Sequence, residues 1–107
     1  MSDELNELDF TIEMNAEGIG PGLEADLFAI ADARLRELAG DKNDMIGAAV
    51  NIRQPAAGET PPLHEVTVVA YTRPKHVAAT EKQRNVIGAL KGALDAVERQ
   101  IKQKREN

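Results

Sequence analysis

Apolar and polar residues alternate along three stretches of this chain. Every second residue is apolar in residues 8–15 and 46–53, and again at Val66, Val68 and Ala70 within 63–71, as expected of strands that bury one face. A tight turn at 72–75 follows the third stretch, and residues 76–80 are predicted to return beside it as a short fourth strand. The proline-containing stretch 54–62 is predicted to be a long exposed loop between the second and third strands.

Two other stretches repeat with the period of a helix. The first helix is predicted over residues 23–39, preceded by Pro21 and ended by Gly40. The second is predicted over residues 81–104. Its apolar stripe consists of Val86, Leu90, Leu94, Val97 and Ile101.

The order β-α-β-β-β-α predicts an α+β fold. The first two strands lie parallel, because the helix between them crosses over, and the other strands form an antiparallel meander. We therefore predict a two-layer sandwich, with a four-stranded mixed sheet and both helices on one face. Residues 1–107 are interpreted as a single domain, with 1–7 and 105–107 expected to fray.

Charge divides the chain into an acidic beginning and a basic end. Residues 1–45 contain twelve acidic and three basic residues, whereas residues 72–107 contain nine basic and four acidic. The last helix gathers a basic face of Arg84, Lys91, Arg99 and Lys102.

This basic face has two interpretations. Pairs four residues apart, Lys91–Asp95, Asp95–Arg99 and Glu98–Lys102, would stabilise an exposed helix without any ligand. The remaining cations instead form a surplus that is typical of a phosphate-binding surface. That surplus comprises Arg73, Lys75, Arg84, Lys104 and Arg105.

Catalytic chemistry has little support in the sequence. The chain has no cysteine, and Ser2 is its one serine, so no nucleophile is evident. His64 and His76 are predicted to lie far apart along the hairpin, too far to form a general base or metal pair. We expect neither an enzyme nor a cofactor, metal or small-molecule substrate. No apolar run reaches the length of a membrane span, and a cytoplasmic location is expected.

The element order and several segments resemble the ribosome hibernation factors. This family comprises ribosome-associated translation inhibitors, also labelled sigma-54 modulation proteins. The similar segments are 85–90 and 97–104 in the last helix, Arg34-Leu35 with Leu38 in the first, and 64–68 followed by Pro74. The chain departs from the family pattern at Glu37 and Ala96, where the family often has lysine.

The resemblance implies a short-form hibernation factor used in stress responses. Such a factor docks on the small ribosomal subunit near the decoding centre, with both helices facing rRNA, and blocks translation by steric exclusion. The implied rRNA-binding residues are Arg34, Lys75, Arg84, Lys91, Arg99, Lys102, Lys104 and Arg105. The alternative is a diverged protein-interaction module of the same fold without rRNA binding, which acidic residues covering Arg34 would indicate. Whether the chain self-associates is left open.

Overall fold

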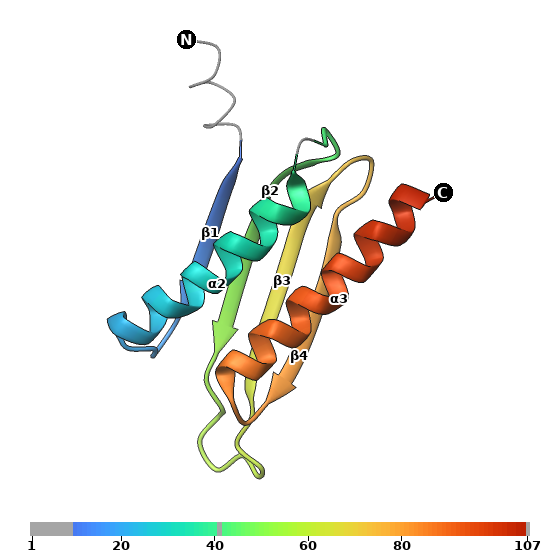
Figure 1. Ribbon diagram of the computed structural model, residues 1–107. Coiled ribbons are helices and arrows are strands. Elements are labelled where there is room, and N and C mark those ends of the chain that lie inside the picture. The colour runs from blue at the N-terminus through green and yellow to red at the C-terminus, as the bar shows by residue number, and fades with distance from the viewer. Residues whose placement is uncertain (1–9, 41, 107) are drawn as a thin grey trace.

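The structure is a sheet of four strands covered on one face by two helices (Figure 1). This computed structural model describes residues 10–40 and 42–106. Its elements, in chain order, are β1 (Thr11–Ala16), α2 (Pro21–Ala39), β2 (Met45–Arg53), β3 (His64–Thr72), β4 (Val77–Gln83) and α3 (Val86–Glu106). The predicted α+β architecture and element order are confirmed.

The sheet has the order β1-β2-β3-β4, so neighbours in the sequence are also neighbours in space. β1 and β2 are parallel, with Ile12 opposite Ala48. β2–β3 and β3–β4 are antiparallel, with Val50 opposite Val68 and Val68 opposite Ala79. The mixed sheet predicted from the crossover helix and the following meander is therefore present.

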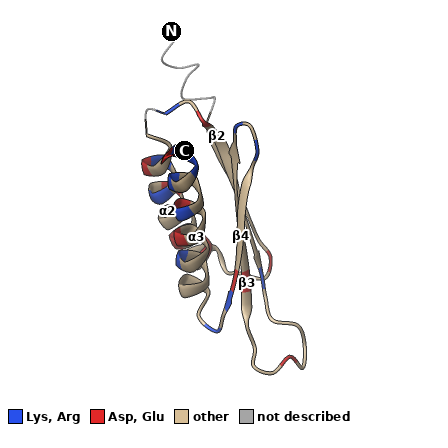
Figure 2. Cartoon of the chain, turned by 90° about the vertical axis from the view of Figure 1, so that its right-hand side faces the viewer, with Lys and Arg blue, Asp and Glu red and all other residues tan. Residues whose placement is uncertain are grey.

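The core lies between the sheet and the helix layer. Alternate residues of β2 and β3 point into it, and both helices contribute one apolar stripe. The largest fully buried side chains are Leu27, Leu35, Val50, Ile52, Val66, Val68, Leu90, Val97 and Ile101. No described helix covers the other sheet face, as Figure 2 shows edge-on.

The boundary between β4 and α3 differs from the sequence prediction. Residues 81–83 were expected to begin the last helix but continue β4, where Glu81 lies opposite Val66. The helix begins after Asn85, whose Oδ1 accepts hydrogen bonds from the backbone N–H groups of Ile87 (2.8 Å) and Gly88 (3.1 Å). The helical spacing of apolar residues begins only at Val86, so this asparagine cap is the better start signal.

Two glycines let α3 lie close to β4. The Glu81 and Gln83 side chains of β4 lie beside Gly92 and Gly88, respectively. A Cβ atom at Gly92 would be 2.8 Å from Cγ of Glu81, closer than carbon atoms can pack. At Gly88 the neighbouring atom is the amide end of the flexible Gln83 side chain, which can rotate away.

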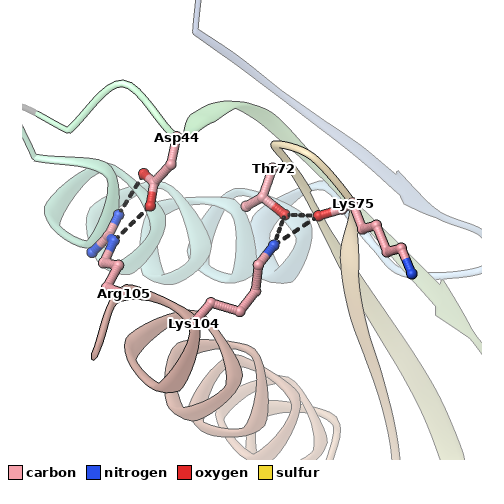
Figure 3. Close-up of polar contacts among 5 residues, drawn as sticks. All are labelled: Asp44, Thr72, Lys75, Lys104 and Arg105. Carbon is pink, nitrogen blue, oxygen red and sulfur yellow. Dashed lines mark hydrogen bonds and ion pairs between the residues drawn. The ribbon is translucent and has the colours of Figure 1, made fainter. Parts of the chain in front are cut away.

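The last turn of α3 is fixed by polar contacts to the residue before β2, to the end of β3 and to the β3–β4 turn (Figure 3). Arg105 donates from Nε and Nη2 to the two carboxylate oxygens of Asp44, at 2.8 and 2.9 Å. Lys104 Nζ donates to Oγ1 of Thr72 (3.2 Å) and to the backbone carbonyl of Lys75 (2.9 Å). Thr72 Oγ1 in turn donates to that carbonyl. We call these five residues the C-terminal clasp.

The clasp holds the last turn of α3 against the sheet. Residues 105 and 106, which were expected to fray, belong to this helix, and their fraying stays a prediction; residues 1–7 and 107 lie outside the described part. The hydrogen bond from Arg105 lowers the pKa of Asp44 below its ordinary value of 3.8, although partial burial opposes this. The carboxylate is therefore fully charged and paired at neutral pH.

We predict that replacing the two glycines by alanine has different effects. Alanine in a helix interior normally gains about 1 kcal/mol over glycine. Gly92→Ala should lose that gain and lower the melting temperature, because its methyl group meets Glu81 Cγ. Gly88→Ala, the matched control, should keep part of that gain and be at least as stable as the parent, because the Gln83 side chain can rotate away. Thermal unfolding of the two variants checks this, and a Gly92→Ala protein more stable than the parent would contradict the packing.

A second prediction concerns the clasp. Asp44→Asn should lower the free energy of unfolding at pH 7 by about 1 kcal/mol, because a two-bond charged pair is lost. The lowered pKa of Asp44 means that its contribution is full at neutral pH and disappears as the pH falls through that pKa. Denaturant unfolding at pH 7 and over a series of acidic pH values measures both effects. Asp26→Asn, an exposed control on α2, should change little, and equal effects of the two variants would count against the clasp.

Candidate nucleic-acid interface

Most charged residues belong to the helix layer and the loops, and the strands contain few (Figure 2). On α2 four acidic residues accompany two basic ones, and on α3 three acidic residues accompany five basic ones. The surplus of positive charge therefore belongs to α3. This helix exposes Lys91, Asp95, Arg99, Lys102 and Glu106, because its apolar stripe faces β3 and β4.

The chain's net charge of −5 comes from acidic residues that lie outside the described structure. Its 13 basic residues are balanced by 13 of the 18 acidic residues of the chain. The other five are Asp3, Glu4, Glu7, Asp9 and Asp41, in the ranges outside it. The described fold is thus neutral overall, and its local charge pattern decides what it can bind.

An arginine on α2 reaches across to α3. Arg34 Nη2 lies 2.7 Å from Oδ1 of Asp95 and 2.9 Å from Oε1 of Glu98. The second carboxylate oxygen of Glu98 lies 2.8 Å from Nζ of Lys102. We call Arg34, Asp95, Glu98 and Lys102 the interhelix ion cluster.

This cluster replaces two of the ion pairs expected within α3. The predicted Glu98–Lys102 pair is formed, but the predicted Lys91–Asp95 and Asp95–Arg99 pairs are not. Asp95 instead pairs with Arg34, which the packing of α2 against α3 brings into reach. Among the described residues, Lys91 and Arg99 consequently form no ion pair.

The pKa shifts agree with this geometry. The hydrogen bond to Asp95, followed by that to Glu98, raises the pKa of Arg34. The hydrogen bond from Lys102, followed by that from Arg34, lowers the pKa of Glu98. Both changes favour the charged forms, so the cluster contains two cations and two anions at neutral pH.

The structure separates the eight predicted rRNA-binding residues into two groups. Four have side chains bound within the molecule: Arg34 and Lys102 in the interhelix ion cluster, and Lys104 and Arg105 in the C-terminal clasp. The other four form no ion pair within residues 10–40 and 42–106: Lys75, Arg84, Lys91 and Arg99. Figure 3 shows the Lys75 side chain pointing away from the clasp, to which this residue contributes its carbonyl.

Sequence reasoning missed the carboxylates that bind the predicted cations. Asp44, Asp95 and Glu98 are as much part of this surface as the cations are. Asp95 and Glu98 were assigned to partners on their own helix, and Asp44 was assigned no role. Local spacing gave no signal for these contacts, because Asp95 lies 61 residues from Arg34 and Asp44 lies 61 residues from Arg105.

The histidines do not form a catalytic pair. His64 Nδ1 lies 3.1 Å from the backbone carbonyl oxygen of Arg84, at one end of β3. The His76 ring contacts the edge of Tyr71 at the other end, with ring centroids 5.0 Å apart, as predicted. Within the described residues no three histidine, cysteine or acidic side chains are placed to hold a metal ion. In the same part of the chain, neither helix is long and apolar enough to cross a membrane.

Comparison with known proteins supports the resemblance at the level of the fold. No protein-family model matches the sequence, and no curated protein matches it. A ribosomal subunit interface protein from Coxiella burnetii matches with a TM-score of 0.65, covering 92% of this chain and 98% of its own, at 9% identity. The N-terminal domain of Protein Y from Thermus thermophilus matches with a TM-score of 0.57, covering 87% and 93% at 14% identity. The fold of this chain is therefore similar to the folds of two proteins. One is named a ribosomal subunit interface protein, and the other is named Protein Y.

Proposed function

We propose that this protein is a ribosome-associated factor that binds the small ribosomal subunit near the decoding centre. The observation that carries the proposal is the fold, shared over nearly the whole chain with a ribosomal subunit interface protein. Ribosome binding would place the protein in the cytoplasm. The predicted rRNA-binding residues complete the proposal, led by the four that form no ion pair within the described residues, Lys75, Arg84, Lys91 and Arg99.

Positive charge on α3 supports an RNA partner. Lys91 and Arg99 are exposed, lie two helical turns apart, and are therefore separated by about 12 Å along the axis. Arg84 adds a cation just before the helix and Lys75 another at the β3–β4 turn. Separate cations along one edge can each contact a different phosphate of a folded RNA, without reading its bases.

The mechanism that fits this surface is steric: the bound protein would occupy space on the ribosome that translation needs. We found no catalytic pair or metal cluster among the described residues. A rigid two-layer domain in the path of mRNA and tRNA would inhibit translation by steric exclusion, with no bond made or broken. Binding free energy alone would then set the degree of inhibition.

A second candidate is a protein-interaction module that kept the fold without rRNA binding. The observation in its favour is that Asp95 and Glu98 cover Arg34. With Arg34 and Lys102 held in ion pairs, the centre of the helix layer offers less positive charge to a phosphate. Co-sedimentation with small ribosomal subunits separates the two candidates.

We predict salt-dependent co-sedimentation with small ribosomal subunits, because cation–phosphate contacts release counterions. Replacing both Arg84 and Lys91 by glutamine should weaken binding and reduce the slope of log K against log salt by about two. The control Arg53→Gln/Lys82→Gln removes the same charge from the sheet side and should bind more like the parent. All variants should unfold at similar temperatures.

Three results would contradict the proposal. Binding that is unchanged between low and moderately high salt would argue against phosphate contacts. A lower melting temperature with undiminished binding in the Arg84→Gln/Lys91→Gln variant would mean that these cations serve the fold. No binding at any salt concentration would favour the protein-interaction module.

A further inference from the structure

The interhelix ion cluster lies in the middle of the basic side of α3. Asp95 is one helical turn from Lys91 and one turn from Arg99, and Glu98 is one turn from Lys102. Two carboxylates are therefore interleaved with the cations proposed to contact RNA. The four cations Arg34, Lys91, Arg99 and Lys102 together with these two anions carry a net charge of +2 (four minus two).

The cluster is accessible to solvent. The exposed fractions of the side chains are 31% for Arg34, 63% for Asp95, 34% for Glu98 and 61% for Lys102. Ion pairs this exposed contribute little to folding stability, because water solvates the separated charges well. A competing anion can therefore displace a carboxylate without disturbing the core beneath.

The carboxylates also present the chemistry that a phosphate would present. Arg34 Nη2 is shared between one oxygen of Asp95 and one oxygen of Glu98, at 2.7 and 2.9 Å. These two anionic oxygens occupy a guanidinium donor that a phosphate oxygen could use instead. A depression in the surface of α3 runs along this side, lined by Asp95, Glu98, Arg99, Lys102, Gln103 and Glu106.

We propose that Asp95 and Glu98 are intramolecular competitors of phosphate, which hold Arg34 and Lys102 until an RNA backbone displaces them. The identity of that RNA rests on the proposed function, whereas the competition itself does not. The cluster lowers the affinity of the helix layer for RNA in general, and two phosphates at the correct spacing are needed to open it. It therefore adds a specificity requirement to a surface that otherwise recognises charge.

The test is to neutralise the two carboxylates. The variant Asp95→Asn/Glu98→Gln keeps the side-chain shapes and raises the local charge from +2 to +4. Its affinity for an RNA duplex of about 20 base pairs, measured by fluorescence anisotropy over a salt series, should exceed that of the parent by about tenfold or more at low salt. The slope of log K against log salt should become steeper by about two.

Two further variants distinguish the release of Arg34 and Lys102 from the effect of a general change in net charge. Glu13→Gln/Glu59→Gln changes the net charge equally, on the open sheet face and in the 54–62 loop, and should raise affinity far less. Adding Arg34→Gln to Asp95→Asn/Glu98→Gln should remove much of the gain. Equal gains for the two charge-neutralised variants, or no gain from Asp95→Asn/Glu98→Gln, would overturn the proposal. Thermal unfolding confirms that each variant is folded.

Co-sedimentation of the same proteins with small subunits keeps this inference separate from the proposed function. Parent protein that binds subunits, with no gain in duplex affinity for Asp95→Asn/Glu98→Gln, would reject the intramolecular competition alone. Parent protein that binds no subunits, with a clear gain in duplex affinity, would reject the ribosomal role and support the competition.

Discussion

The packing of α3 against β3 and β4 determines both the fold and the surface that we propose to bind RNA. Val86, Leu90, Val97 and Ile101 bury one side of the helix almost completely. Because a helix has a fixed angular spacing, burying these residues forces the cations and carboxylates of α3 outward. Gly88 and Gly92 let the helix approach β4, and the C-terminal clasp fixes its last turn. A shift in this packing would rearrange every charged residue in the site.

The binding properties of the charged surface therefore depend more on how the helices pack than on the number of charged residues. Arg34 belongs to an otherwise acidic helix, yet it lies beside Asp95 and Glu98 because α2 packs against α3. The result is a helix layer whose central cations, Arg34 and Lys102, are paired with carboxylates. The cations that form no ion pair within the described residues lie around this centre. Such a surface can bind a polyanion, but with an affinity limited by its own carboxylates. The same arrangement makes the protein-interaction alternative worth testing directly.

The sequence predicted what depends on local periodicity. Alternation identified β2 and β3, helical spacing identified both helices, and the crossover rule gave the mixed sheet. It failed at Glu81–Gln83, where β4 continues because pairing with β3 outweighs a helical pattern that begins only at Val86. It also assigned Asp95 to Lys91 and Arg99, since positions four residues apart are visible in a sequence and a residue on another helix is not. The partners of Arg34 and Arg105, both 61 or more residues away, could not have been predicted from spacing.

The central claim is that the helix layer, and not the open sheet face, contacts rRNA of the small subunit. The chain has no cysteine, so a single introduced cysteine can carry one tethered iron–EDTA probe that cleaves nearby RNA. Gln103→Cys places the probe on the exposed side of α3, and Asn51→Cys places it on the open sheet face. With both proteins bound to small subunits, the probe at position 103 should cleave rRNA near the decoding centre, and the probe at position 51 should give little cleavage there. Cleavage from position 51 alone, or from position 103 at a distant part of the subunit, would contradict the account.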